Sequence, residues 1–216
     1  MRFYVHGAGR GGRDAWPAQS EVDAVFADHS SAPRTGEKAE LVAGQLPGGD
    51  VVVVAHSLGA VPVALAYAAG DLPVSQVVLL EPALYDVARG DDAVEAHVGP
   101  MTHARARAER GDLYGFWQVV APMMFGREAS RDDWAEDEEL ARRFATIDPP
   151  WGHGLDATVF ADVPTLVLTG GWNDEYEAIA RRLVDAGAVH VQLPGARHRP
   201  QDHPGFEGAL ATFLHG

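Results

Sequence analysis

The chain has 216 residues, no cysteine and a formal net charge of −14. The length suits one α/β domain with a sizeable core, and the lack of cysteine excludes disulfides and thiolate metal sites. The negative charge would repel phosphate backbones and anionic lipids, so we expect no nucleic acid and no membrane as a partner.

The first residues predict a short strand that ends in a glycine-rich loop. Residues 2–6 read RFYVH, and residues 7–12 read GAGRGG. Because this strand follows Met1 directly, we expect no signal peptide and a cytoplasmic protein. Glycines after a strand can also bind the phosphates of a dinucleotide, but the spacing is not GxGxxG and no long helix follows. We therefore expect no cofactor.

Residues 51–69 predict a strand, a tight turn and a helix. The strand is VVVV at 51–54, the turn is AHSLG at 55–59, and an apolar stretch with helical spacing follows at 61–69. This order places Ser57 on the turn, as in a nucleophile elbow, where a strained turn exposes a serine hydroxyl. The alternative is that Ser57 only caps the N-terminus of the helix.

The neighbours of this serine favour the elbow. A strand and a helix that meet so closely need small residues two positions before and after the serine, and Ala55 and Gly59 stand there. At the helix N-terminus the backbone N–H of Leu58 is free to face a developing oxyanion.

Apolar strands alternate with helices along much of the remaining chain, which indicates a parallel sheet covered on both faces. We predict a three-layer α/β/α fold with a mostly parallel sheet of about six strands. Further strands are expected at residues 24–27 (a weak candidate), 76–80, 163–169 and 189–193, and helices at 37–46, 175–186 and 206–214.

Residues 83–160 differ from the rest because they combine acidic runs with many large apolar side chains. Helices are expected at 91–110 and 131–146, the second begun by Ser130. We interpret this stretch as a helical cap inserted after the strand that ends at Glu81, with residues 1–82 and 161–216 forming the core. Its apolar residues either line a pocket over the serine or only pack the cap itself.

Two carboxylates follow predicted strands. Glu81 comes directly after the strand at 76–80, where an unpaired buried carboxylate would be costly, so it is a candidate functional group or else a cap or ion-pair partner. Asp174 follows the strand at 163–169, three residues after Gly171. Together with Glu177 it also has the spacing of a helix capping box.

Ser57, an acid and a histidine in the last loop follow one another along the chain, and in this the protein resembles the α/β-hydrolase family. The resemblance covers nearly the whole chain. Its most specific motifs are AHSLG at 55–59, HGAG at 6–9 and LPGARHRPQDHPGFEGALATFL at 193–214. It implies a serine hydrolase of this fold with a helical cap.

The resemblance also implies roles for individual residues. His198 is the general base that takes the Ser57 proton, and the Leu58 and Ala8 N–H groups hold the oxyanion. His6 and Gly7 belong to the same oxyanion loop as Ala8.

For the acid the family offers two positions. The common one corresponds to Asp174, and some members carry the acid one strand earlier, which here is Glu81. We favour Glu81, because Asp174 already has a structural role as a possible helix cap.

The expected activity is the cleavage of an ester, a thioester or a similar small apolar acyl substrate. The alternatives are a lyase or cofactor-free oxidative enzyme that uses the same residues for proton transfer, and a non-catalytic protein that binds a small molecule. No metal site is expected, because His198 and His203 lack a helical i, i+4 spacing and a third ligand. No sequence feature defines an oligomeric state.

Overall fold

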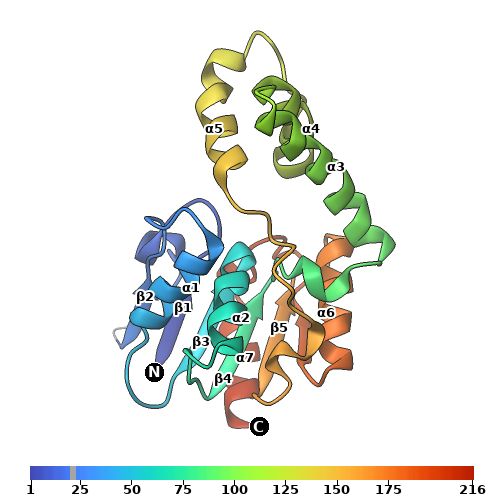
Figure 1. Ribbon diagram of the computed structural model, residues 1–216. Helices are drawn as coiled ribbons and strands as arrows, with labels where there is room; N and C mark the ends of the chain where they lie inside the picture. The colour runs from blue at the N-terminus through green and yellow to red at the C-terminus, as the bar shows by residue number, and fades with distance from the viewer. Residues whose placement is uncertain (20–22) are drawn as a thin grey trace. The chain divides into compact units, whose positions relative to one another are not determined.

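The computed structural model describes residues 1–19 and 23–216 and contains a six-stranded parallel sheet (Figure 1). The strands lie in the order β2-β1-β3-β4-β5-β6. They are β1 (Arg2–Val5), β2 (Ala24–Ala27), β3 (Val52–His56), β4 (Gln76–Leu80), β5 (Thr165–Thr169) and β6 (Val189–Gln192). The predicted sheet is confirmed, including its weak strand candidate at residues 24–27.

Strands β3, β4 and β5 lie inside the sheet and are buried, and most of their residues are apolar. Every residue of β3 and β5 is buried, as is all of β4 except its first residue. Continuous apolar runs of this kind are typical of parallel strands that are covered on both faces. The edge strand β6 is less protected, and Val189 at its start is 51% exposed.

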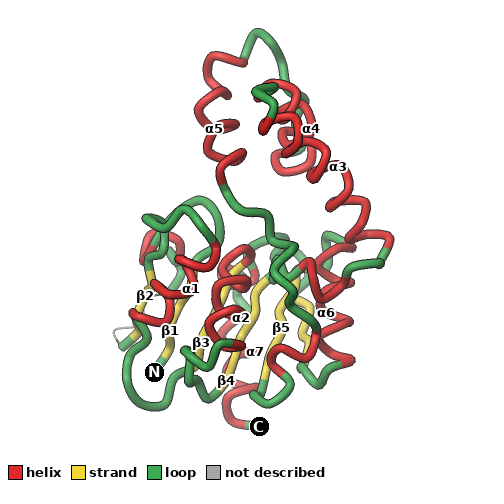
Figure 2. Tube along the Cα trace, viewed as in Figure 1, coloured by secondary structure: helices red, strands yellow, loops and turns green. Residues whose placement is uncertain are grey.

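Helices cover both faces of this sheet. In Figure 1, α1 and α2 lie in front of the strands and α7 lies behind them, and Figure 2 shows the same layers by secondary structure. Phe206 and Leu210 of α7 pack with Val54, Leu80 and Leu168 in one buried cluster. The helices are α1 (Thr35–Gly44), α2 (Ala60–Ala68), α6 (Asp174–Asp185) and α7 (Phe206–His215), with 3₁₀ turns at Gly12–Ala15, Ser57–Gly59, Tyr85–Ala88, Ala157–Phe160 and Pro200–Asp202.

Contacts divide the chain into two compact units. The first consists of residues 1–89 and 150–216 and contains the sheet; the second consists of residues 90–149. The Asp86 carboxylate accepts hydrogen bonds from the N–H groups of Gly152 and His153, each at 2.7 Å. These two bonds tie the outgoing and returning chains together within the first unit.

The second unit is made of α3 (Asp92–Glu109), α4 (Leu113–Phe125) and α5 (Trp134–Thr146). Trp117 of α4 is fully buried, and its indole N–H donates to Asp137 Oδ2 at 2.8 Å. Arg127 forms an ion pair with the same carboxylate, so its charge is compensated. Helix α4 was not expected from the sequence, because its residues are almost all apolar, without a polar face, and include Pro122.

Helix α5 begins later than the sequence predicted. Its first residue is Trp134, whereas Ser130 was expected to begin it. The Ser130 hydroxyl instead accepts a hydrogen bond from the Asp132 N–H at 3.1 Å. Serine side chains commonly stabilise such local turns in competition with a helix, and here the helix starts only after the turn.

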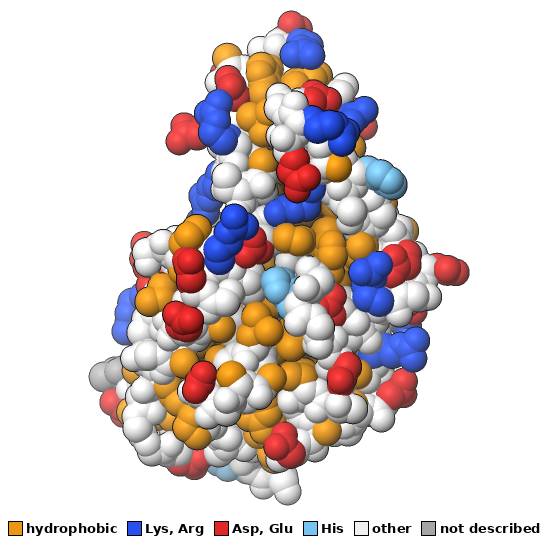
Figure 3. All heavy atoms as spheres, viewed as in Figure 1, with side chains coloured by type: hydrophobic (Ala, Val, Ile, Leu, Met, Phe, Trp, Pro, Cys, Tyr) orange, Lys and Arg blue, Asp and Glu red, His pale blue; other side chains and the backbone are white. Residues whose placement is uncertain are grey.

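Charged side chains of both signs are interspersed on the face of the molecule shown in Figure 3. In the described parts of the chain, 1–19 and 23–216, no helix combines the length and the apolar character needed to cross a lipid bilayer.

Candidate active site

Ser57 lies on a strained turn between β3 and α2. Its φ is 53°, in the left-handed region that residues with a Cβ rarely adopt. The 3₁₀ turn that includes Ser57 leads directly into α2, whose N-cap is Gly59, without a side-chain cap. Ser57 therefore does not cap α2, and the backbone instead presents its hydroxyl at the carboxyl edge of the sheet.

Two glycines allow the close packing that this turn needs. A Cβ on Gly59 would lie 2.3 Å from the carbonyl oxygen of His6, and a Cβ on Gly7 would lie 3.0 Å from the Cβ of Ser57. The loop after β1 therefore runs directly against the serine turn.

The His198 side chain contacts the Ser57 hydroxyl. Its Nε2 lies 3.0 Å from Ser57 Oγ, within hydrogen-bonding distance. Behind it, the buried His56 holds the loop, because His56 Nε2 lies 2.7 Å from the carbonyl oxygen of His198. A carbonyl can only accept, so His56 Nε2 carries the proton. Burial, followed by the proximity of His198, lowers the pKa of His56 to about 3, so this ring is neutral.

Glu81 lies on the other side of the His198 ring. It is fully buried, and its Oε2 lies 3.7 Å from His198 Nδ1. The carboxylate also accepts hydrogen bonds from the Gly170 N–H at 2.5 Å and from the Trp172 indole N–H at 3.1 Å. These two donors compensate for the loss of water around a buried charge. In the described residues, His198 Nδ1 has no hydrogen bond, so Glu81 is its nearest charged neighbour.

Backbone strain is concentrated at this site. Among residues 1–19 and 23–216, positive φ values of non-glycine residues occur at Ser57, Glu81 (44°) and Arg197 (49°). Arg197 directly precedes His198. Strained conformations persist only where the surrounding structure fixes them, and they are common at functional sites.

Asp174, the other acid candidate, lies elsewhere. It is exposed as the first residue of α6, and in the described parts of the chain it forms no hydrogen bond or ion pair with His198. The capping box expected for it is wrong: the N-cap is Asn173, whose side-chain oxygen accepts from the Glu175 N–H at 2.8 Å.

The loop after β1 is held by a pair of stacked histidines. His6 Nδ1 lies 2.7 Å from the Gly7 carbonyl oxygen and must donate to it, while the His29 N–H donates to His6 Nε2 at 3.4 Å. In the described residues, neither the Ala8 N–H nor the Leu58 N–H donates to a loop, a turn or a side chain. Both N–H groups are therefore available to a ligand.

Tyr176 is a site residue that the sequence analysis missed. It is buried, its ring lies 5.2 Å from that of His198, and its hydroxyl interacts with the Ser57 side chain. Burial, followed by the charges of Glu175 and Glu81, raises its pKa well above the ordinary value, so the hydroxyl keeps its proton. One signal was present in the sequence: Trp172 and Tyr176 are aromatic residues four apart, just beyond the end of β5.

In the part of the chain that the structure describes, no group of three His, Asp or Glu side chains is arranged to hold a metal ion. His203, the other histidine considered from the sequence, accepts the Gly205 N–H through Nδ1 at 3.0 Å at the entry to α7.

The fold agrees with a family assignment. A family model described as the alpha/beta hydrolase family matches residues 3–207. The protein belongs to the alpha/beta hydrolase family. No curated protein matches the chain.

Solved structures of other alpha/beta hydrolase folds are similar over nearly the whole chain. MenH from S. aureus is 15% identical with a TM-score of 0.61, over 99% of this chain and 92% of MenH. A bromoperoxidase from Bacillus anthracis is 16% identical with a TM-score of 0.62, over 100% of this chain and 92% of that protein. A thermophilic esterase from Thermogutta terrifontis is 21% identical with a TM-score of 0.57, over 99% and 89%. At these identities the likeness establishes the fold alone.

Proposed function

We propose that this alpha/beta hydrolase family member is a serine hydrolase that cleaves an ester, a thioester or a similar small apolar acyl substrate. Ser57 is the nucleophile, His198 the general base, and Glu81 the acid that orients the base. The observation that carries the proposal is the 3.0 Å contact between Ser57 Oγ and His198 Nε2 at a strained strand-to-helix turn. A nucleophile within hydrogen-bonding distance of its base is the geometric signature of covalent acyl transfer.

The first step forms an acyl-enzyme. His198 Nε2 takes the proton from Ser57 Oγ as the oxygen attacks the carbonyl carbon. The protonated His198 then gives this proton to the departing alcohol or thiol, and the carbon–leaving-group bond breaks. Glu81 stabilises the imidazolium through the Nδ1 side of the ring.

The negative charge of the tetrahedral intermediate needs hydrogen-bond donors that are already in place. The N–H groups of Ala8 and Leu58 serve this role, with His6 and Gly7 fixing the loop that carries Ala8. Removal of one such donor in other enzymes costs about two to three orders of magnitude in kcat. In the second step, water attacks the acyl-enzyme, His198 takes its proton, and Ser57 leaves with that proton.

A fluorophosphonate probe followed by intact-mass spectrometry and peptide mapping tests the proposal. We expect one adduct per chain, located on Ser57, and no adduct on the Ser57→Ala variant. Ser75→Ala is the matched control, since the Ser75 hydroxyl is engaged with the Val51 carbonyl at the opposite end of the sheet. It should label like the wild type.

The same samples are then assayed with p-nitrophenyl hexanoate. Loss of turnover in Ser57→Ala with an unchanged melting temperature supports hydrolysis. A folded wild-type protein that takes no adduct and releases no nitrophenol would contradict the proposal in favour of a binding protein. Labelling without ester hydrolysis would contradict the hydrolysis step and favour a lyase or another proton-transfer enzyme.

A further inference from the structure

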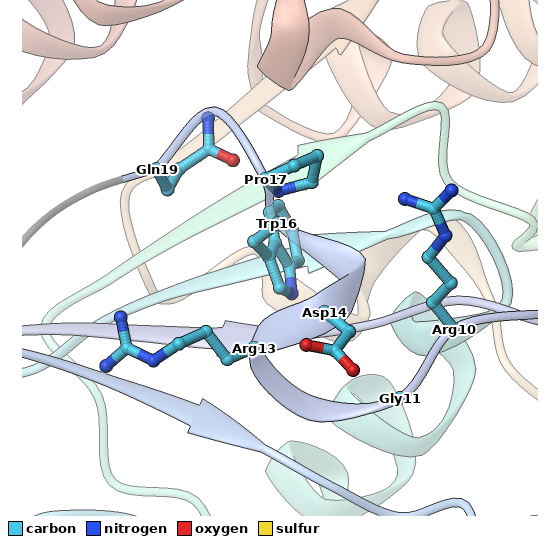
Figure 4. A pocket seen from close by; sticks show the side chains of 7 residues that line it. All are labelled: Arg10, Gly11, Arg13, Asp14, Trp16, Pro17 and Gln19. Carbon is cyan, nitrogen blue, oxygen red and sulfur yellow. The ribbon is translucent and has the colours of Figure 1, made fainter.

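A cavity of about 390 Å³ lies beside the loop that follows β1. Its lining includes Gly7, Ala8 and Arg10 of this loop, His56 from the serine turn, and Arg199 from the loop of His198. A second cavity of about 610 Å³ shares Arg10 and continues the lining to Trp16 (Figure 4). Volumes of this size accommodate small molecules.

Two residues that line the cavity, Gly7 and His56, lie next to Ser57. His56 directly precedes Ser57 in the chain, and a Cβ on Gly7 would lie 3.0 Å from the Cβ of Ser57. Ala8 carries one of the two N–H groups proposed for the oxyanion. A substrate whose carbonyl group lies against these groups can therefore extend one of its ends into the cavity.

The backbone of this loop is specialised for its conformation. Gly9 has a φ of 108° and Gly12 a φ of 49°, both in the region that favours glycine. A Cβ on Gly11 would lie 2.3 Å from the hydroxyl oxygen of Ser30. Each of these glycines is therefore explained by the conformation or the packing of the backbone. Arg10 is the one residue of 9–12 that has a side chain.

The other arginines around the two cavities already have partners. Arg199 forms an ion pair with Asp202 and also donates to the Ala15 carbonyl at 3.0 Å. Arg13 lies with its guanidinium carbon 4.2 Å from the centre of the Phe26 ring. In Figure 4, Arg10 and Arg13 stand on opposite sides of Trp16.

Arg10, in contrast, forms no ion pair or hydrogen bond within residues 1–19 and 23–216. The chain carries a net charge of −14, so its overall field does not attract anions. An anion that binds at this cavity would have to be recognised at short range. A guanidinium suits a carboxylate for this purpose, because it can donate two parallel hydrogen bonds to the two oxygens.

We propose that Arg10 forms a carboxylate subsite of the active site, and that the substrates are esters or thioesters whose acyl or alcohol part ends in a free carboxylate. This inference rests on the proposed hydrolase function and defines its substrate class. The rest of the substrate lies along the apolar wall formed by Ala15 and Pro17. The single charge of the Arg10 guanidinium, which has no ion-pair partner within residues 1–19 and 23–216, matches the single charge of a carboxylate.

The test compares two esters with the same acyl chain length, mono-p-nitrophenyl adipate and p-nitrophenyl hexanoate. The wild type should prefer the adipate ester in kcat/KM. Arg10→Gln should lose at least tenfold in kcat/KM for the adipate ester, mostly through KM, and change less than twofold for the hexanoate. Arg10→Lys should recover part of the loss, because it restores the charge without the fork geometry.

Arg13→Gln is the matched control, since it removes the same charge from the same loop. This variant should leave the ratio of kcat/KM for the adipate ester to kcat/KM for the hexanoate ester unchanged. An equal loss in Arg10→Gln and Arg13→Gln, or a loss that is the same for both esters, would overturn the carboxylate subsite while hexanoate hydrolysis still supported the hydrolase proposal.

A binding measurement decides the inference independently of turnover. Titration calorimetry should show that monomethyl adipate binds to the Ser57→Ala variant, and that its affinity is about tenfold lower for the double variant Ser57→Ala/Arg10→Gln. If neither ester is hydrolysed but this binding difference is found, the hydrolase proposal fails and the carboxylate site stands. Equal affinity of the single and the double variant for monomethyl adipate would refute the carboxylate site.

Discussion

Glu81 Oε2 lies 3.7 Å from His198 Nδ1, just beyond hydrogen-bonding distance, although Glu81 is fully buried. The Gly170 and Trp172 N–H groups hold the carboxylate in place beside the His198 ring. Catalytic hydrogen bonds are often long before the substrate is bound. Glu81, and not Asp174, is therefore the carboxylate that we propose to orient the histidine.

Glu81→Gln should reduce kcat for p-nitrophenyl hexanoate by about three to four orders of magnitude, as in triads whose histidine takes the wrong tautomer. The amide has nearly the same shape, but its NH2 group cannot accept from one of the two N–H donors, so the melting temperature should fall and kcat is compared at a temperature at which both variants are folded. Asp174→Asn is the matched control and should stay within about twofold of the wild type. Steady-state kinetics of the two variants measure the difference, and a larger loss in Asp174→Asn would refute the assignment.

Tyr176→Phe should lower kcat by about tenfold, because it removes the hydroxyl that interacts with the Ser57 side chain and leaves the buried ring in place. The rate of fluorophosphonate labelling should fall by a similar factor. Tyr67→Phe is the matched control: the Tyr67 hydroxyl donates to Asp162 at 2.8 Å, and its loss should not change either rate. If Tyr176→Phe labels at the wild-type rate, its hydroxyl has no part in positioning the nucleophile.

The fold could be predicted from the sequence because its signals are local. The apolar runs of β3 and β4 and the small residues around Ser57 define strands and a turn without knowledge of the rest of the chain. The contact between Ser57 and His198 was expected only from the resemblance to a family, because 141 residues separate the two. No local sequence pattern encodes the contact of His198 with Ser57.

The environment of Glu81 could not be predicted for the same reason. Its partners Gly170 and Trp172 come from the end of β5, and their contact depends on the pairing of β4 with β5. The N-cap residue of α6 could not be predicted from the sequence either. Asn173 and Asp174 are both good caps, and only the path of the chain after β5 selects Asn173.

Two buried histidines should make stability depend on pH. Burial, followed by a neighbouring histidine in each case, lowers the pKa of His56 to about 3 and that of His29 to about 4, from an ordinary 6.5. Between about pH 4 and 6.5 the unfolded chain thus binds more protons than the folded one. The free energy of unfolding rises with pH across this window and falls as the solution is acidified.

Each of these histidines should contribute up to about 2 kcal/mol to the loss of stability between pH 7 and pH 5. Urea unfolding of His56→Gln at both pH values should show a smaller loss than the wild type, whatever its stability at pH 7. His215→Gln, at an exposed position of α7, should keep the full pH dependence. An unchanged pH dependence in His56→Gln would mean that His56 is protonated in the folded protein.

Gly59 should be sensitive to the addition of one methyl group. Its φ is −63°, which suits any residue, so the only obstacle to alanine is space. A Cβ there would lie 2.3 Å from the His6 carbonyl oxygen and 2.9 Å from that of Val5, and a backbone cannot move aside as a flexible side chain can. Gly59→Ala should therefore cost about 3 kcal/mol of stability through overpacking, or prevent folding.

Gly44→Ala provides the comparison, because no atom lies within 4 Å of its added Cβ. In α1 this change should stabilise the protein by up to about 1 kcal/mol. Urea unfolding measures both variants, and equal stability of the two would show that β1 does not press against the serine turn.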